Sequence, residues 1–339
     1  MRLLCSLLLL ACVGANAAEP AATPPTLPAP PKLDVPLPDT SITTTAPPDV
    51  VPPNSTVEEV TVEAPEPRYA APTRRDRIGR VWAPVAINGK GPFRLVLDTG
   101  ATGAAIIRSV ADRLGISTAN AKMIRLHGVT GSAMVPTIKV DTLEVGDLLL
   151  EGRRLPIVAD AFGGAEGVLG TEGLADKRIY IDFVHDAISI TRSKRQPASP
   201  DFASIPLVMG RDRLLRMEIM IGSVRTIAIL DTGAQLTVGN HALRDLLKRR
   251  RSEELKTAEV IGVTLDVAQG QLMSVPTIHM GSSIQVRGLK LTFGDMFIFE
   301  QWKLSHEPAV LIGMDIIGSF EALVIDYKKK ELQIRAKRG

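Results

Sequence analysis

Cysteine and net charge are what this sequence has least of. The only cysteines, Cys5 and Cys12, lie in an N-terminal segment that we expect to be removed. A mature chain without thiols excludes a cysteine nucleophile, a disulfide framework and a cysteine-ligated metal. The 40 basic and 37 acidic residues leave a formal charge of +3. This charge is too small to indicate binding to nucleic acid or to an anionic membrane surface.

Long apolar segments are missing beyond the N-terminus. Leu3–Val13 is apolar but too short to span a bilayer. With Arg2 before it and Ala15-Asn16-Ala17 after it, the segment has the pattern of a cleavable export signal. We therefore expect a signal peptide over residues 1–18, a periplasmic or secreted protein, and no integral membrane segment after cleavage. A lipid anchor on Cys12 is the alternative, because the residues before it loosely resemble a lipobox.

Two common hydrolase signatures are also absent. The five histidines show no His-Glu-x-x-His spacing, which argues against a zinc protease. The chain has no Gly-x-Ser-x-Gly nucleophile turn. We expect neither a metal nor any other cofactor.

Proline is concentrated in one stretch. Fifteen of the 24 prolines fall between residues 19 and 72. This density prevents both helices and sheet ladders, so we expect a disordered linker over residues 19–78, with an inhibitory propeptide as the alternative. Basic runs at Arg74–Arg80, Arg192–Arg195 and Lys248–Arg251 are expected to be solvated helix faces and linkers.

Two later stretches of similar length repeat one pattern. In each, two short strands joined by a turn lead into the same four residues, Asp98-Thr99-Gly100-Ala101 in the first copy and Asp231-Thr232-Gly233-Ala234 in the second. The turn glycines, Gly89 and Gly222, each lie nine residues before their Asp. Matched spacing of this kind indicates two copies of one structural unit.

The copies agree again toward their ends. Gly167-Val168-Leu169-Gly170 matches Val310-Leu311-Ile312-Gly313, and Ile181-Asp182-Phe183 matches Ile325-Asp326-Tyr327. Because Asp182 and Asp326 each follow an apolar strand, we expect them to be strand-end or turn carboxylates and not a second reactive pair.

The repeat predicts the organisation of the chain. We expect an N-terminal lobe over residues 79–196, a connecting linker over 197–204 and a C-terminal lobe over 205–339. Each lobe has a helix-like segment, Ile106–Leu114 in the first and His241–Lys256 in the second. The second copy is longer by ten residues, which we place around Phe297–Glu307.

The repeated acidic residues suggest acid–base chemistry. Two carboxylates brought face to face at about 3 Å cannot both ionise, so they share one proton. Of Asp98 and Asp231, one would then act as general base on a bridging water. The other would polarise the carbonyl of the bond to be cleaved.

The neighbours of each Asp suit such a pair. Thr99 and Thr232 carry hydroxyls that can form hydrogen bonds across the lobe interface. Gly100 and Gly233 lack a Cβ, so the backbone can turn tightly and approach a substrate closely.

An Asp-Thr-Gly-Ala turn after an apolar strand, followed by an apolar-apolar-Gly segment and an Ile-Asp-aromatic strand, resembles the retropepsin-like aspartic proteases. The resemblance covers about residues 80–337 as two tandem copies. It implies an all-β, two-lobed acid-protease fold, in which retropepsin-like barrel domains are related by a pseudo-two-fold axis. It also implies water-mediated peptide hydrolysis, with a polypeptide as substrate and a single chain that could be active as a monomer.

The resemblance also points to substrate flaps at two hairpin tips. Gly128, Val129 and Thr130 form the first tip, and Gly262 and Val263 belong to the second. Ordinary surface hairpins are the alternative. His127, beside the first tip, is expected to be exposed to solvent.

The sequence departs from the pepsins in two respects. Ala101 and Ala234 stand where pepsins have Ser or Thr, and no tyrosine lies in either flap. A missing hydroxyl removes a hydrogen bond that could stabilise the ionised carboxylate. We therefore expect a pH optimum less acidic than that of a pepsin.

The sequence thus predicts an aspartic endopeptidase that acts on exported or envelope proteins. Two alternatives remain: a non-catalytic peptide-binding or scaffold protein of the same fold in the periplasm, and a tethered envelope protein that works through its proline-rich arm.

Overall fold

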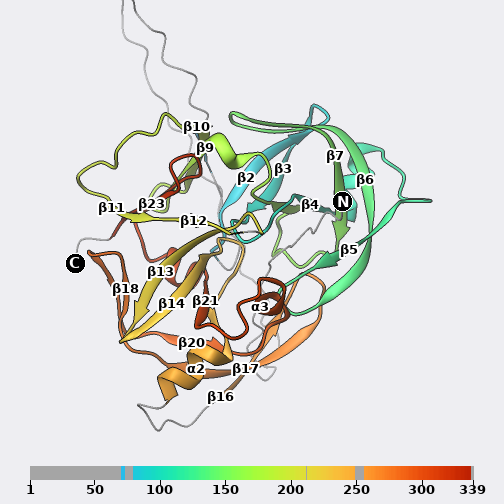
Figure 1. Cartoon of the computed structure of the whole chain (residues 1–339). Helices are drawn as coiled ribbons and strands as arrows, with labels where there is room; N and C mark the ends of the chain where they lie inside the picture. Colours follow the sequence, from blue (N-terminus) through green and yellow to red (C-terminus); the bar gives the residue numbers. More distant parts are fainter. Residues whose placement is uncertain (1–69, 73–78, 211, 249–255, 337–339) are drawn as a thin grey trace, which may run out of the picture. The chain divides into compact units, whose positions relative to one another are not determined.

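The computed structural model of this chain describes residues 70–72, 79–210, 212–248 and 256–336. The predicted signal peptide, Cys12 and most of the predicted linker lie outside the described residues. Strands dominate the described part, and they form two lobes joined by a shared sheet (Figure 1). The all-β, two-lobed fold predicted from the sequence is confirmed.

The N-terminal lobe is built on a seven-stranded sheet. Its order is β2 (Trp82–Ile87), β3 (Lys90–Leu97), β8 (Gly167–Leu169), β4 (Ala105–Ile107), β7 (Leu148–Val158), β6 (Ser132–Val145) and β5 (Met123–His127). Strand β2 also pairs with β6. Helix α1 (Arg108–Leu114) follows β4. The sequence predicts this helix from Ile106, but Ile106 and Ile107 are strand residues, so the helix begins two residues later than predicted.

The C-terminal lobe repeats this arrangement in a ten-stranded sheet. Its order is β16 (Lys256–Ile261), β17 (Val267–Ser274), β20 (Lys290–Phe293), β15 (Val238–Gly239), β21 (Ala309–Ile312), β14 (Val224–Leu230), β13 (Leu215–Ile221), β18 (Ile278–Met280) and β19 (Ile284–Val286), with β12 (Val208–Met209) on β13. Helix α2 covers His241–Lys248. The prediction of helix up to Lys256 is wrong at its end, since β16 begins there.

Both lobes share one strand arrangement around the repeated motif. Strand β3 runs parallel to β8, and β14 runs parallel to β21. The strands β8 and β21 are buried along their whole length, as is usual for parallel strands covered on both faces. The apolar-apolar-Gly segments therefore lie directly beside the strands that end at the two aspartates.

A third sheet takes strands from both lobes. Its order is β1 (Ala70–Pro72), β10 (Ala187–Arg192), β9 (Lys177–Asp182), β22 (Ala322–Asp326), β23 (Glu331–Arg335) and β11 (Ala203–Pro206). Strand β1 falls within the range 19–78 predicted to be a disordered linker, so that prediction is wrong for residues 70–72. Proline is accepted here because β1 is an edge strand.

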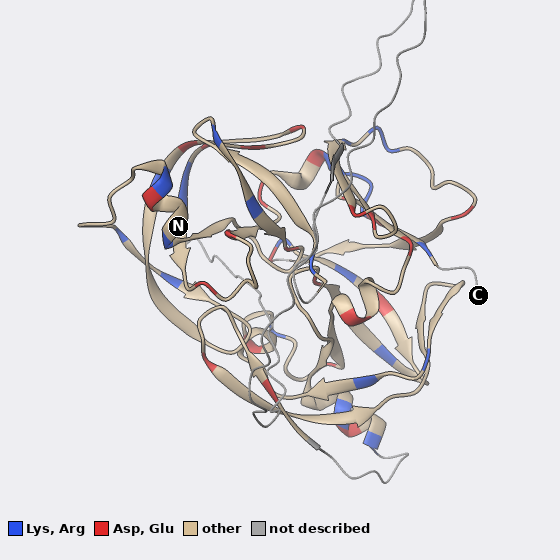
Figure 2. Ribbon diagram, turned by 180° about the vertical axis from the view of Figure 1, so that it is seen from behind, with Lys and Arg blue, Asp and Glu red and all other residues tan. Residues whose placement is uncertain are grey.

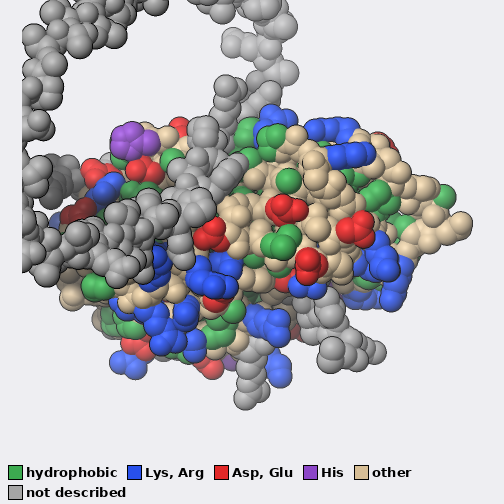
Figure 3. Space-filling view, turned by 90° about the horizontal axis from the view of Figure 1, so that it is seen from above, with side chains coloured by type: hydrophobic (Ala, Val, Ile, Leu, Met, Phe, Trp, Pro, Cys, Tyr) green, Lys and Arg blue, Asp and Glu red, His purple; other side chains and the backbone are tan. Residues whose placement is uncertain are grey.

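Short helices complete the fold. The 3-10 turn η1 (Leu174–Asp176) precedes β9, and α4 (Met314–Ile317) follows β21. Helix α3 (Phe297–Gln301) lies in the stretch where the second copy is longer. Acidic and basic residues are interspersed along the ribbon in Figure 2, and side chains of both signs occur on the face seen in Figure 3, in keeping with the small net charge.

Candidate active site

Each motif aspartate directly follows a strand whose last three residues are buried. The Asp98 N–H donates to the carbonyl of Leu169, and the Asp231 N–H donates to the carbonyl of Ile312, both at 2.9 Å. The two copies therefore hold their acidic residues by the same backbone bond to the adjacent parallel strand. A side chain carried by such a buried strand is preorganised.

Hydrogen bonds of the two threonines join the lobes at this point. Thr99 Oγ1 donates to the carbonyl of Leu230 at 2.7 Å and accepts from the Thr232 N–H at 3.2 Å. Thr232 Oγ1 donates to the carbonyl of Leu97 at 2.6 Å and accepts from the Thr99 N–H at 3.2 Å. The four bonds form a reciprocal set that fixes the two Asp-Thr-Gly turns against each other.

The turn glycines show how close the carboxyl groups come. A Cβ on Gly100 would lie 2.6 Å from Cγ of Asp231, and a Cβ on Gly233 would clash in the same way with Asp98. Each carboxyl group thus packs on the turn of the opposite lobe. Only glycine leaves that space free, because every other residue places a carbon there.

Each carboxyl group has one oxygen bonded and one oxygen unbonded. Asp98 Oδ1 accepts from the N–H groups of Gly100 and Ala101, both at 2.9 Å. Asp231 Oδ1 accepts from Gly233 at 2.8 Å and from Ala234 at 3.0 Å. The Oδ2 atoms of both aspartates are buried without a hydrogen-bond partner among the described residues.

Burial raises the proton affinity of both groups. Asp98 and Asp231 have no solvent-exposed surface. Burial, together with the charge of Asp231, raises the pKa of Asp98 well above its usual range. Burial raises the pKa of Asp231 to about 7, against the lowering effects of the hydrogen bonds around it and of the charge of Arg80. The pair therefore holds a shared proton near neutral pH.

Sequence reasoning missed two residues beside the pair. Arg80 was assigned to a solvated basic run, yet its side chain is fully buried and its charge acts on Asp231. Tyr327 was noted only as part of a strand pattern. It is buried, and burial and the charge of Asp98 raise the pKa of its phenol.

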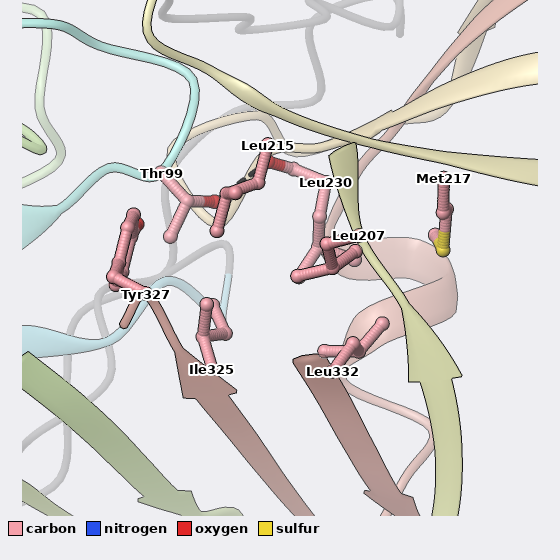
Figure 4. A pocket seen from close by; sticks show the side chains of 8 residues that line it. All are labelled: Thr99, Leu207, Leu215, Met217, Leu230, Ile325, Tyr327 and Leu332. Carbon is pink, nitrogen blue, oxygen red and sulfur yellow. Dashed lines mark hydrogen bonds between the residues drawn. The ribbon is translucent and has the colours of Figure 1, made fainter. Parts of the chain in front are cut away.

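Tyr327 and Thr99 border a small apolar pocket between the C-terminal lobe and the shared sheet. Its remaining lining residues are Leu207, Leu215, Met217, Leu230, Ile325 and Leu332. Figure 4 shows Thr99 and Tyr327 at one end of the pocket and Met217 at the other. The pocket thus lies beside the threonine network and not under a flap.

The two predicted flap tips contact each other. The tips lie between β5 and β6 and between β16 and β17. The Gly262 N–H donates to Thr130 Oγ1 at 3.1 Å. A Cβ on Gly128 would lie 3.2 Å from a methyl group of Val263. Val129 and Val263, the apolar residues at the tips, are both almost completely buried, so the structure shows a closed arrangement.

The first flap is also held by helix α3. Val129 belongs to an apolar cluster of the C-terminal lobe that includes Phe299 and Trp302, and its carbonyl accepts from the Ile298 N–H at 3.1 Å. The ring of His127 stacks on Phe297, with centroids 5.6 Å apart and planes at 4°.

The expectation of an exposed His127 is therefore wrong. Its ring is half-buried against Phe297, and burial, followed by the charge of Arg125, lowers its pKa. The extra segment of the second copy thus carries the helix that docks the first flap.

Asp182 and Asp326 are the last residues of β9 and β22, which are the strand-end positions predicted for them. Asp182 accepts from the backbone of Val184 and His185, and Asp326 accepts from Ser193 Oγ and from the Lys329 N–H. Within the described ranges, no cluster of His, Cys, Asp and Glu is arranged to bind a metal. No helix in this part of the chain has the length and apolar character needed to cross a membrane.

Residues 83–172 match the family model "Aspartyl protease". No curated protein sequence matches the chain significantly. A retropepsin-like aspartic protease from Rickettsia conorii is similar over 37% of this chain and 91% of its own, with 18% identity and a TM-score of 0.29. Basic 7S globulin from soybean is similar over 80% of this chain and 95% of its own, with 9% identity and a TM-score of 0.41.

Proposed function

Because the chain has the fold and the paired Asp-Thr-Gly-Ala turns of a retropepsin-like aspartic protease, we propose that it is an aspartic endopeptidase. The observation that carries this proposal is the meeting of two fully buried carboxyl groups, each packed on the glycine of the opposite turn. Equal hydrogen bonds to both Oδ1 atoms leave both Oδ2 atoms for a shared proton and a water molecule.

The shared proton defines the roles in the first step. The ionised member of the pair Asp98 and Asp231 takes a proton from the attacking water. The protonated member gives its proton to the carbonyl oxygen as the water oxygen bonds to the carbonyl carbon. The tetrahedral intermediate collapses when the leaving nitrogen receives the proton that was taken from the water and the C–N bond breaks. A hydroxyl of the intermediate returns its proton to the other carboxylate, which restores the starting state of the pair. The carboxylic acid product and the amine then leave.

Raised pKa values also bear on the pH optimum. The active pair carries one proton, and this state exists between its two ionisation steps. Burial moves both steps upward, so we expect cleavage to be fastest nearer neutral pH than in a pepsin. A rate maximum near pH 2–3 would contradict this expectation.

Access to the pair requires the flaps to separate. In the closed arrangement, the tips formed by Gly128–Thr130 and Gly262–Val263 contact each other, and neither aspartate is exposed. A polypeptide would enter after the tips part and be covered when they close again, which excludes water from the reaction.

The location and the substrates belong to the same proposal. The N-terminal pattern around Leu3–Val13 supports export, so the substrates would be exported or envelope proteins in the periplasm or outside the cell. Anchoring through Cys12 is the alternative form of the mature protein.

The proposal is tested with the mature chain and a peptide library read by mass spectrometry. We expect the wild type to cleave, and Asp98→Asn and Asp231→Asn each to abolish cleavage, because neither half of the pair works alone. Asp141→Asn, at an exposed position of β6, is the control and should cleave like the wild type.

Two results would overturn the proposal. Full activity in either of the two active-site variants would exclude a shared pair. Peptide binding by the wild type without any cleavage would favour the non-catalytic binding protein. Inhibition by a statine-type transition-state mimic gives an independent check.

A further inference from the structure

Four basic segments meet at one end of the shared sheet. They are the start of β9, the end of β10, the loop after β10 and the hairpin loop between β22 and β23. Lys329 Nζ donates to the Gln196 carbonyl at 3.4 Å, and Arg178 donates to the Gln196 side chain at 3.3 Å. Ser193 Oγ donates to the carboxylate of Asp326 at 2.7 Å. Blue segments gather around this loop at the upper right of Figure 2.

This end of the sheet carries an excess of positive charge. Its basic residues, which we call the basic end, are Lys177, Arg178, Arg192, Lys194, Arg195, Lys328, Lys329 and Lys330. The acidic residues among them are Asp147, Asp176, Asp326 and Glu331. Eight basic side chains thus face four acidic ones, an excess already larger than the formal charge of +3 of the whole chain. The small net charge therefore hides a strongly basic local surface.

Acidic side chains neutralise part of the basic end. Asp176 pairs with Lys177 at 2.9 Å and with Arg192 at 3.3 Å. Glu331 pairs with Lys329 at 2.9 Å. These pairs hold the loop and the hairpin in place, but they do not use all of the cations.

The cations that remain exposed include Arg195, Lys328 and Lys330. Within the described ranges, none of these three is paired with an acidic group. All three follow strands of a hydrogen-bonded sheet, so their positions relative to one another are fixed by the fold. Exposed cations held together in this way attract an anionic surface.

An exposed apolar side chain borders the basic end. The Leu207 N–H donates to the Lys330 carbonyl at 2.9 Å, which places Val208 beside the hairpin loop. Val208 is 69% exposed, so it is free to enter an apolar layer. Basic residues next to an exposed apolar one are typical of surfaces that bind the headgroup region of a membrane. Nucleic acid fits less well, because Tyr327, the aromatic residue of the hairpin loop, is buried and cannot stack on a base.

The N-terminal part of the chain joins the fold at the same end. Strand β1 pairs antiparallel with β10, and Ala70 at its start lies opposite Ser189. Arg192 is three residues further along β10, so Ala70 lies about 10 Å from the level of the basic end. Residues 14–69 connect this point to the apolar segment Leu3–Val13. In the form anchored through Cys12, this connection would raise the concentration of lipid at the basic end.

We propose that the basic end of the shared sheet binds the anionic phospholipid surface of a membrane. Arg195, Lys328 and Lys330 contact the lipid phosphates, and Val208 enters the boundary between headgroups and acyl chains. This inference goes beyond the proposed function and does not depend on it, because binding requires no cleavage.

Vesicle flotation with the mature chain tests this surface. The vesicles consist of phosphatidylcholine alone or of equal parts of phosphatidylcholine and phosphatidylglycerol. We expect binding only where phosphatidylglycerol is present, and weaker binding as the salt concentration rises, because salt screens exposed charges. The triple variant Arg195→Gln, Lys328→Gln, Lys330→Gln should bind about a hundredfold more weakly, since each basic residue near an anionic surface contributes about fivefold. If it does not fold, Lys328→Gln alone decides the case, with an expected loss of about fivefold.

The matched control removes the same charge elsewhere. The triple variant Lys122→Gln, Arg287→Gln, Lys290→Gln changes exposed positions outside the basic end and should bind like the wild type. Equal weakening in both triple variants, or no binding of the wild type to phosphatidylglycerol vesicles, would overturn the inference.

Soluble anions distinguish a lipid surface from a free polyanion. Inorganic phosphate and polyphosphate are added as competitors, and we expect neither to displace the protein at the lipid's phosphate concentration. Val208→Ser should weaken binding to vesicles, because a serine gains nothing from entering the lipid. Tighter binding to polyphosphate than to vesicles, with no effect of Val208→Ser on vesicle binding, would assign the basic end to a soluble polyanion and overturn the inference.

Discussion

The threonine network between the lobes offers a quantitative test of how the site is held. Thr99→Val keeps the shape of the side chain but removes its hydroxyl. Two bonds are lost: the donation to the Leu230 carbonyl at 2.7 Å and the acceptance from the Thr232 N–H at 3.2 Å. Thr99 is nearly fully buried and Thr232 fully buried, so solvent cannot replace these bonds.

The expected loss of stability follows from the two backbone groups that are left without a partner, the Leu230 carbonyl and the Thr232 N–H. A buried polar group that loses its partner destabilises the fold by about 1–3 kcal/mol. Two such groups give about 2–6 kcal/mol for Thr99→Val. Thr232→Val should cost a similar amount, because its hydroxyl makes the mirror-image pair of bonds.

Urea unfolding followed by circular dichroism measures these costs. Thr257→Val, at an exposed position of β16, is the control for the chemical change and should unfold like the wild type. The double variant should lose less free energy of unfolding than the sum of the two single variants. Removing one hydroxyl already weakens the hydrogen-bond geometry of the other. A Thr99→Val protein within about 0.5 kcal/mol of the wild type would refute the reasoning, because that is the range of neutral surface changes.

Two further predictions concern the carboxyl groups and the flap. Folding raises the pKa of Asp231 from 3.8 to about 7, so the stability that its protonated carboxyl group contributes is full below pH 3.8 and is lost as pH rises through about 7. We expect Asp231→Asn to match the wild type near pH 4 and to be more stable above pH 7 in urea unfolding; a pH-independent difference would contradict this. Phe297→Ala removes the ring stacked on His127 and should speed amide hydrogen exchange over residues 126–132. The exposed change Met123→Ala should not do so, and equal exchange in both variants would show that α3 does not hold the flap.

Much of the architecture could be predicted because its signals are local and occur twice. The strand before each aspartate, the Asp-Thr-Gly-Ala turn and the later apolar-apolar-Gly segment lie at matched positions in both copies. In the structure, each of these segments pairs as its counterpart does. The extra residues around Phe297 could be located because one copy is longer than the other.

Three features could not be predicted because contacts between residues distant in sequence determine them. They are the burial of Arg80, the burial of His127 and the formation of strand β1. Arg80 follows a run of basic residues that look like solvated linker, and only the fold shows that it is buried. His127 is covered by Phe297, which is distant in sequence. Strand β1 is Ala-Ala-Pro, which has no strand propensity, and it forms because β10 offers a free edge.

The shared sheet has a consequence for how the two lobes are held together. Strands β9 and β22 pair at its centre, with β10 and β23 beside them and β1 and β11 at the two edges. The covalent link between the lobes runs through residues 193–202, outside every ladder of that sheet. A nick in this segment would leave all six strands paired, and the halves would be held as two separate subunits would be. The lobes are thus joined by backbone hydrogen bonds between strands as well as by the chain itself.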